Sequence, residues 1–213
     1  MVLHERKAGI LFPIFSLPSP YGIGTFGDAA YRFADCLREA GQYYWQILPV
    51  GPTGYGDSPY QSFSTFAGNP YFVDPDILKS EGLLTDEDIA CFDWGSDLQY
   101  VDYGLLYRNR YRLLERAFGR FVPDATYDRF LQEEAGWIND YAVFMVQKEH
   151  RTSEFYLFVQ YEFFRQWFAL KKYVNNLGIR IIGDIPIYVA MDSADVMADK
   201  RLFQFDEDGR PSA

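Results

Sequence analysis

Residues 43 to 50 read Tyr-Tyr-Trp-Gln-Ile-Leu-Pro-Val, an apolar run that predicts a strand. Upstream, residues 9 to 17 read Gly-Ile-Leu-Phe-Pro-Ile-Phe-Ser-Leu and predict a buried strand that is apolar on both faces, as parallel strands tend to be. Between the two runs, apolar residues recur at helical spacing from a predicted cap at Asp28 to a stop at Gly41. Strand, helix and strand in this order predict one βαβ unit.

A third strand and its exit loop are expected at residues 179 to 189, Ile-Arg-Ile-Ile-Gly-Asp-Ile-Pro-Ile-Tyr-Val. A long helix rich in aromatic residues is expected before it, over 154–177. Further helices are expected at 107–118 and 130–150, and helix starts at Asp74 and Thr85. Parallel strands separated by helices predict either an α/β barrel or a doubly wound sheet.

The stretch between the second and third strands is far longer than a crossover needs, which predicts an inserted subdomain. We expect three segments: strands 1 and 2 with their loop at 1–75, a largely helical subdomain at 76–153, and the long helix with strand 3 at 154–213. A complete eightfold barrel takes about 250 residues before insertions. The chain is therefore expected to be the front portion of a larger enzyme.

The loop after the second strand, from Pro49 to Pro75, has five prolines, four glycines and six aromatic residues, but only two charged residues. Disordered linkers lack aromatic residues, so this composition predicts an ordered loop. Flat aromatic faces, amides and a few carboxylates suit a ligand with apolar CH faces and many hydroxyls, which is a sugar. The alternative is an ordinary loop that buries its own aromatic side chains.

Charge and composition exclude several classes of partner. The formal net charge is −10, which argues against nucleic acid and anionic membranes because phosphate repels such a surface. No apolar run reaches transmembrane length, and the first residues lack the apolar core of a signal peptide. The two cysteines, Cys36 and Cys91, match neither a disulfide framework nor a zinc signature. A cytoplasmic protein is expected.

The motif Gly22-Ile-Gly24-Thr-Phe-Gly27 matches the dinucleotide-binding pattern G-x-G-x-x-G between a strand and a helix. Two features argue against a nucleotide site: residues 16–21 intervene where the turn should be tight, and the second strand ends without an acid for the ribose. We expect instead a turn that lets the backbone approach a neighbouring loop.

Asp184 follows the third predicted strand, at the end where α/β barrels build their active sites. This position favours a functional role, and the alternative is an Asp that holds its own loop through backbone hydrogen bonds. Residues 192–195, Asp-Ser-Ala-Asp, are interpreted as a helix cap with an acid in the first turn.

Eight segments, spread in order over nearly the whole chain, together resemble the amylomaltases, a family of 4-α-glucanotransferases. They are Gly9-Ile-Leu-Phe-Pro, Tyr21-Gly-Ile-Gly-Thr-Phe-Gly-Asp28, Trp45-Gln-Ile-Leu-Pro-Val-Gly-Pro52, Gly56-Asp-Ser-Pro-Tyr-Gln-Ser62, Ala67-Gly-Asn-Pro-Tyr71, Val101-Asp-Tyr103, Phe163-Phe-Arg-Gln-Trp167 and Ile182-Gly-Asp-Ile-Pro-Ile-Tyr-Val189.

The resemblance implies a (β/α)8 barrel with inserted subdomains, of which this chain holds the first three strands. It also implies a retaining transfer of α-1,4-glucan segments between maltooligosaccharides, without a cofactor, in which two carboxylates share the chemistry. By resemblance, Ser58 and Tyr60 line the donor subsites and Asp184 belongs near the reacting glucose. Tyr55 is similar to a residue of a secondary glucan groove.

The chain also departs from the family. The catalytic acids of the family lie on later strands, so by resemblance they fall beyond Ala213 and within the remainder of the catalytic domain. Relatives have a longer connector where this chain has residues 150–154, and Met191 and Met197 replace the usual His and Trp. Two other hypotheses stay open: a non-catalytic glucan-binding fragment, and a nucleotide-dependent oxidoreductase that uses the glycine motif.

Overall fold

The computed structural model describes residues 6–54, 56–97, 99–210 and 212. It is an α/β structure whose chain divides into two compact units. The first unit takes in Met1–Pro49, Pro70–Phe121 and Glu162–Asp184, and the second takes in Val50–Asn69, Val122–Tyr161 and Ile185–Ala213, each as far as the structure describes them.

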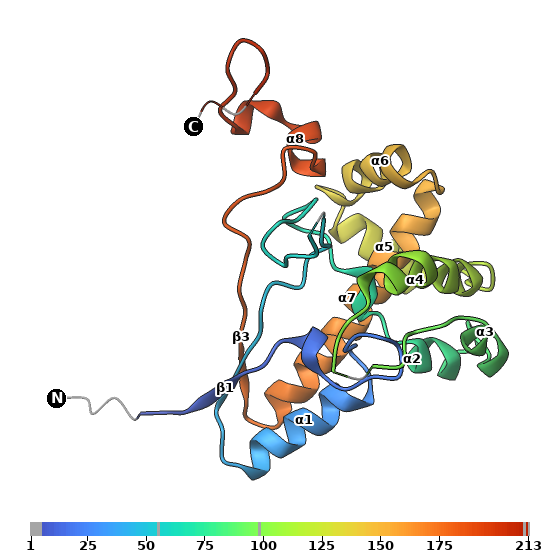
Figure 1. Ribbon diagram of the computed structural model, residues 1–213, viewed down its shortest axis with the longest axis vertical. Coiled ribbons are helices and arrows are strands. Elements are labelled where there is room, and N and C mark those ends of the chain that lie inside the picture. Colours follow the sequence, from blue (N-terminus) through green and yellow to red (C-terminus); the bar gives the residue numbers. More distant parts are fainter. Residues whose placement is uncertain (1–5, 55, 98, 211, 213) are drawn as a thin grey trace. The chain divides into compact units, whose positions relative to one another are not determined.

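Three parallel strands form the sheet of the first unit, β1 (Gly9–Leu11), β2 (Tyr44–Gln46) and β3 (Arg180–Ile182) (Figure 1). Their order is β1-β2-β3, with Ile10 opposite Trp45 and Trp45 opposite Ile181. The predicted βαβ unit is confirmed, because α1 (Asp28–Glu39) connects β1 to β2. All three strands are shorter than their apolar runs predict.

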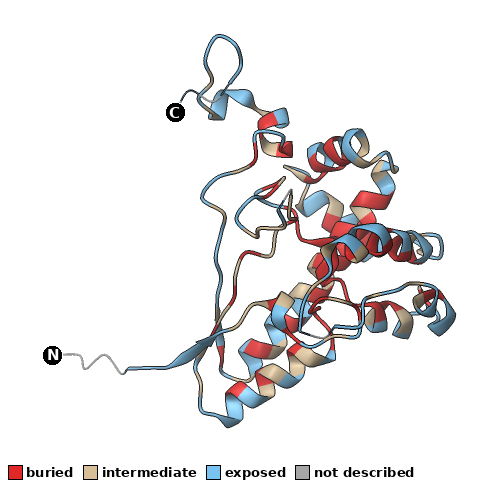
Figure 2. Ribbon diagram, viewed as in Figure 1, coloured by how far each residue is buried: buried red, intermediate tan, exposed pale blue. Residues whose placement is uncertain are grey.

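The first strand does not have the expected burial. We predicted a buried strand over 9–17, but β1 ends at Leu11, and its side chains Ile10 and Leu11 are 41% and 53% exposed. Pro13 lacks the N–H that a ladder needs, and a 3-10 helix, η1 (Ile14–Ser16), follows it. Among the strands of the described residues, only the central strand β2 has a neighbour on each side, and its Trp45 is fully buried. Figure 2 shows β1 in the colour of exposed residues.

The boundaries of α1 need one correction. Asp28 is not the cap: the N-cap is Gly27, and Asp28 lies in the first turn, where it pairs with Arg32 at 3.0 Å. The predicted stop at Gly41 is confirmed, since this residue has a left-handed φ of 67° just after the helix.

In the described residues, five α-helices lie between β2 and the long helix that precedes β3. They are α2 (Pro75–Ser80), α3 (Asp86–Ala90), α4 (Tyr103–Phe118), α5 (Ala125–Glu133) and α6 (Ile138–Glu149). Helices α2 to α4 belong to the first unit, and α5 and α6 to the second. The predicted caps of α2 and α3 are confirmed: Asp74 accepts from the Ile77 N–H, and Thr85 makes a capping box with Asp88.

Two predicted helices have different bounds. Helix α4 begins four residues before 107, because Asp102 caps it by accepting from the Leu105 N–H at 2.9 Å. The single helix predicted over 130–150 is wrong, since the chain breaks between α5 and α6. Trp137 precedes α6 with φ −143°, outside the helical region, and Gly136 before it disfavours a continuous helix.

The long helix is confirmed as α7 (Ser153–Asn176), followed by Gly178 with φ 82°. Its residues up to Tyr161 belong to the second unit and those from Glu162 to the first. After β3 come α8 (Ala194–Ala198) and a 3-10 helix, η3 (Lys200–Leu202). The helix cap predicted within 192–195 is confirmed, with Ser193 as the N-cap and Asp195 in the first turn. Among the described residues, no helix is both long enough and apolar enough to cross a membrane.

Candidate functional site

The loop at residues 50–69 is held at its base by backbone and side-chain hydrogen bonds within the second unit. The Asn69 N–H donates to the Val50 carbonyl at 2.8 Å. The buried Gln160 side chain of α7 accepts from the Gly68 N–H at 2.7 Å and donates to the Gly68 carbonyl at 3.0 Å. One amide thus satisfies both backbone groups of Gly68, which fixes the loop without exposing unpaired polar atoms.

Two buried serines stabilise the middle of the same loop. The Ser62 hydroxyl donates to the Ser64 carbonyl at 2.7 Å, and the Ser64 hydroxyl accepts from the N–H groups of Phe66 and Ala67, both at 3.2 Å. The Ala190 N–H also donates to the Ser62 carbonyl at 3.1 Å. The hydroxyls of these two serines hold the loop together. The composition of the loop suits a sugar ligand, but these two hydroxyls are already used within the loop.

The tip of the loop presents two of the residues expected to bind substrate. The Tyr60 N–H donates to the Ser58 hydroxyl oxygen at 3.3 Å, which places these residues together. The Gly54 N–H closes the tip by donating to the Gln61 carbonyl at 3.2 Å. Tyr60 is 46% exposed, so its ring is not simply buried in the loop. The third expected residue of this loop, Tyr55, lies outside the described residues.

Asp57, a half-buried carboxylate, lies between Gly56 and Ser58 at the tip of the 50–69 loop. Its backbone adopts a left-handed φ of 55°, and burial raises the pKa of its carboxyl above the ordinary value. A carboxylate that has lost part of its water is ready to accept hydroxyl hydrogen bonds from a sugar, since charge-assisted bonds are the stronger kind.

Asp184 lies two residues beyond β3, at the carboxyl end of the parallel sheet, and it is exposed. This end is ordered up to the strand boundary, because the Ile47 N–H donates to the Ile182 carbonyl at 3.0 Å. Asp184 belongs to the first unit, and Ser58 and Tyr60 belong to the second. The structure thus brings Ser58 and Tyr60 together, and it places Asp184 just beyond the carboxyl end of the three-stranded sheet.

The glycine motif has the structural role expected of it. A side chain on Gly24 would lie 1.9 Å from the Ile14 carbonyl oxygen, and one on Gly27 would lie 2.0 Å from an oxygen of Asp74. Gly22 has φ +77° and approaches the Trp94 carbonyl. Gly22 and Gly24 allow close packing against backbone carbonyls and Gly27 against the Asp74 carboxylate, which explains the motif without a nucleotide.

Two residues that order the loop, Gln160 and Asp195, leave little signal of this role in the sequence. Gln160 lies 92 residues from Gly68 along the chain, so no local pattern reveals the contact, although a glutamine inside an aromatic helix is a weak signal of it. Asp195 has the expected place in the first turn of α8, but it also accepts from the Thr65 N–H at 3.0 Å.

Two methionines stand where the family usually has His and Trp: Met191 is exposed, and Met197 lies on α8. In the part of the chain that the structure describes, no group of histidine, cysteine or acidic residues could hold a metal ion.

Comparison with protein families gives a match to a family described as 4-alpha-glucanotransferase, over residues 12–154 and 146–211. The 4-alpha-glucanotransferase of Clostridium butyricum is 43% identical, over 89% of this chain and 45% of its own length. That of Thermus thermophilus is 44% identical, over 97% of this chain and 47% of its own. The chain thus spans about half the length of these relatives.

Solved structures show the same likeness. The amylomaltase from Streptococcus agalactiae in complex with acarbose matches with a TM-score of 0.91 and 41% identity, over 97% of this chain and 48% of that chain. The amylomaltase from Corynebacterium glutamicum matches with a TM-score of 0.76 and 20% identity, which shows a shared fold.

The relatives contain residues that have no counterpart here. The alignment with the 4-alpha-glucanotransferase of Streptococcus pneumoniae spans 241 positions, more than the 213 residues of this chain. The two family matches meet at 146–154, where α6 ends at Glu149 and α7 begins at Ser153. This agrees with the shortened connector expected at 150–154.

Proposed function

Because this chain belongs to the 4-alpha-glucanotransferase family, we propose that it is the donor-binding part of an enzyme that transfers α-1,4-glucan segments between maltooligosaccharides. The observation that carries the proposal is the fixed loop tip. The loop is held by Gln160 at its base and by Ser62 and Ser64 in its middle, while at its tip Tyr60 is exposed and Ser58 is half-buried. Such preorganisation lowers the entropy that a flexible sugar chain must lose on binding.

In this proposal the site residues of this chain bind the donor glucan, and the catalytic acids lie elsewhere in the protein. Tyr60 offers a ring face to the CH face of a donor glucose, Ser58 a hydroxyl to its oxygens, and Asp184 a carboxylate to the hydroxyls of the reacting sugar. Tyr55 is proposed to extend a secondary groove for long glucans. A retaining transfer also needs a nucleophilic carboxylate that attacks the anomeric carbon and an acid that protonates the leaving oxygen. We assign neither role to a residue of this chain.

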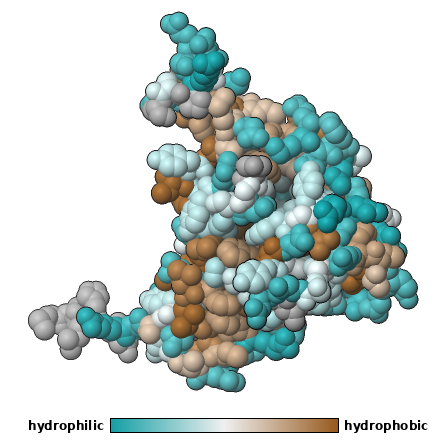
Figure 3. Space-filling model, viewed as in Figure 1, coloured by the Kyte–Doolittle hydropathy of each residue, from teal (hydrophilic) through white to brown (hydrophobic). Residues whose placement is uncertain are grey.

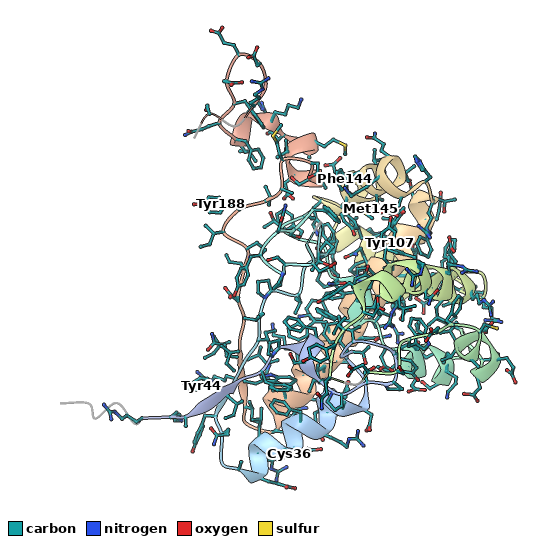
Figure 4. The ribbon with its side chains drawn as sticks, in the orientation of Figure 1. Cys36, Tyr44, Tyr107, Phe144, Met145 and Tyr188 are labelled. Carbon is teal, nitrogen blue, oxygen red and sulfur yellow. The ribbon has the colours of Figure 1, made fainter. Side chains whose placement is uncertain are left out.

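The same proposal covers the fold. The three parallel strands would be the first of a (β/α)8 barrel, with strands 1 and 2 and their loop at 1–75, a helical insertion at 76–153, and α7 with strand 3 at 154–213. Exposed apolar side chains support it: on the outer strands, Ile10, Leu11 and Ile182 are 41%, 53% and 42% exposed. Hydrophobic residues also gather on the face of the molecule that Figure 3 shows. Tyr188 is 80% exposed and points away from the chain (Figure 4). The partner proposed for this surface is the remainder of the catalytic domain.

Apart from the remainder of the catalytic domain, the partners that we propose are α-1,4-glucans. We do not propose nucleic acid or membranes as partners. A net charge of −10 repels phosphate groups. Cys36 and Cys91 are both exposed and unpaired, which favours a reducing compartment, so we place the protein in the cytoplasm.

Calorimetric titration of the chain tests the ligand class. We expect maltoheptaose to bind saturably, and cellohexaose, with the same sugar in β-1,4 linkage, to bind far more weakly. NADH serves as a second negative control, because binding of NADH would support the oxidoreductase hypothesis instead. Failure of maltoheptaose to bind would contradict the proposal.

Complementation tests the activity. The chain is co-expressed with the second half of the Clostridium butyricum relative, and glucose release from maltotriose is measured. We expect release only when both parts are present. If a stable complex forms, still binds maltoheptaose and releases no glucose, the chain is better described as a non-catalytic glucan-binding fragment.

A further inference from the structure

A cavity of about 290 Å³ in the second unit has no role in the site described above. It lies where α8 packs against α6 and the 50–69 loop, and its walls include Phe66, Trp137, Asp140, Asp195, Ala198 and Leu202. We call it the Phe66–Trp137 pocket. Its volume is near the lower end of the range of about 300 to 1,000 Å³ that is usual for small-molecule sites.

An aromatic platform forms one wall of this pocket. The rings of Phe66 and Trp137 stack with an interplanar angle of 19° and centroids 6.0 Å apart. Phe66 nevertheless is 57% exposed. The Trp137 ring is held because its indole donates to Glu134 at 2.6 Å, and the Phe66 ring stacks on it from a backbone whose N–H donates to the Ser64 hydroxyl at 3.2 Å. A fixed ring with an open face binds an apolar surface at little cost in entropy.

Carboxylates line the other walls of the pocket. Asp140 is exposed in the first turn of α6, and Asp195 uses one oxygen to accept from the Thr65 N–H. Asp199 also lines the pocket, but Arg201 pairs with both of its oxygens. The pocket is therefore acidic and repels anions such as phosphate, while Asp140 and Asp195 provide acceptors for hydroxyl donors.

We infer that the Phe66–Trp137 pocket binds one or two glucosyl residues of an α-1,4-glucan, as a subsite distinct from the Ser58–Tyr60 tip. A glucosyl ring has an apolar CH face for the Phe66 ring and hydroxyls for the carboxylates, and it carries no charge that the acids would repel. This inference rests on the proposed function for its choice of glucan. Its consequence is that long glucans gain affinity from the pocket.

Proton–nitrogen NMR of the chain with maltoheptaose tests the subsite. The chain has four tryptophans, and a Trp137→Phe variant identifies the indole signal of Trp137. We expect this signal to shift saturably as maltoheptaose is added. We expect Phe66→Ala to weaken the affinity read from this signal roughly threefold to tenfold, and Phe66→Trp, which keeps a platform, to preserve it.

A matched control and a second measurement separate the outcomes. Phe168→Ala removes a ring that is 50% exposed on α7, and it should leave the titration unchanged. If calorimetry shows that maltoheptaose binds but the Trp137 signal does not move, or if Phe66→Ala has no effect, the subsite is refuted and the proposed function stands. If calorimetry shows no binding at all, the proposed function fails and the subsite fails with it.

Discussion

Tyr60 is the residue whose ring is expected to contact the donor sugar. Its backbone is fixed by Ser58 and its side chain is 46% exposed, so truncation should remove a contact without disturbing the core. An aromatic contact of this kind contributes about 1 kcal/mol, so Tyr60→Ala should weaken maltoheptaose binding about fivefold. Tyr60→Phe keeps the ring and should bind nearly as well. Equal binding by the alanine variant and the unmodified chain in calorimetry would show that the ring only packs.

A substitution of Asp184 distinguishes two roles for this residue, binding of a sugar and stabilisation of its own loop. Asp184→Asn keeps the shape of the side chain but loses its charge, and charge-assisted hydrogen bonds are roughly twice as strong as neutral ones. We expect weaker maltoheptaose binding with an unchanged melting temperature, because the residue is exposed after β3. A lowered melting temperature with intact binding would instead assign Asp184 to its own loop.

His150 is the residue with the clearest backbone strain in the short connector between α6 and α7. It caps α6 with a left-handed φ of 60°, and its N–H donates to the Val146 carbonyl at 3.0 Å. Non-glycine residues pay roughly 1 kcal/mol for this conformation, so His150→Gly should raise the free energy of unfolding by up to about 1 kcal/mol. His150→Ala retains the Cβ atom and should give no such gain. Equal effects of the two variants in denaturant titrations would refute the argument.

At the scale of single elements, the charged groups at the start of α3 should make the free energy of unfolding depend on pH in the acidic range. The Arg120 ion pair at 2.7 Å, with the Thr85 N–H and Arg116, lowers the pKa of the Asp88 carboxyl to about 2. Since this pKa lies below its unfolded value near 3.8, the stabilisation is complete above about pH 4 and is lost as pH falls toward 2.

Denaturant titrations between pH 7 and pH 2.5 measure this acid dependence. Asp88→Asn should lower the free energy of unfolding at pH 7 by about 1 kcal/mol and should flatten its fall in acid. Asp128→Asn, at an exposed position on α5, serves as the control for loss of a charge. An unchanged acid slope in the Asp88 variant would show that the pair with Arg120 contributes nothing.

The elements also show which signals in the sequence are reliable. Helix caps depend on a few neighbouring residues, so the caps at Asp74 and Thr85 are predicted correctly and the cap predicted at Asp28 is wrong by one residue. Strand lengths were overestimated because β pairing depends on distant partners: apolar residues 9–17 contain Pro13, and the ladder stops before it.

The candidate site shows the same limit. The composition of the 49–75 stretch predicted an ordered loop, and the resemblance singled out Ser58 and Tyr60 at its tip. The Gln160 clamp on Gly68 and the stacking of Phe66 on Trp137 join residues far apart in the chain. Only folding brings such groups together, so the sequence predicts neither the partner of Gln160 nor the Phe66–Trp137 pocket.

At the scale of the whole molecule, the chain covers about half the length of its relatives, and its outer strands carry exposed apolar side chains. Uncovered strand edges and apolar faces invite association. Ile187 is 84% exposed, so Ile187→Lys should reduce aggregation of the purified chain in light scattering. Val122→Lys changes a similarly exposed apolar residue, at 80%, outside the sheet and its exit loop. If both variants aggregate equally, the exit loop has no special part in association.

Residues 1 to 213 alone are expected to bind glucan without catalysing its transfer. Retaining chemistry needs a nucleophile and an acid/base about 5 to 5.5 Å apart, and both must be positioned together. The candidate site has two carboxylates, Asp57 and Asp184, and we propose that both bind sugar hydroxyls rather than carry out the chemistry. Incubation with maltotriose should therefore release no glucose, while the Clostridium butyricum relative in parallel should release it. Glucose release by the chain alone, abolished by Asp57→Asn or Asp184→Asn, would overturn this expectation and make those carboxylates the catalytic pair.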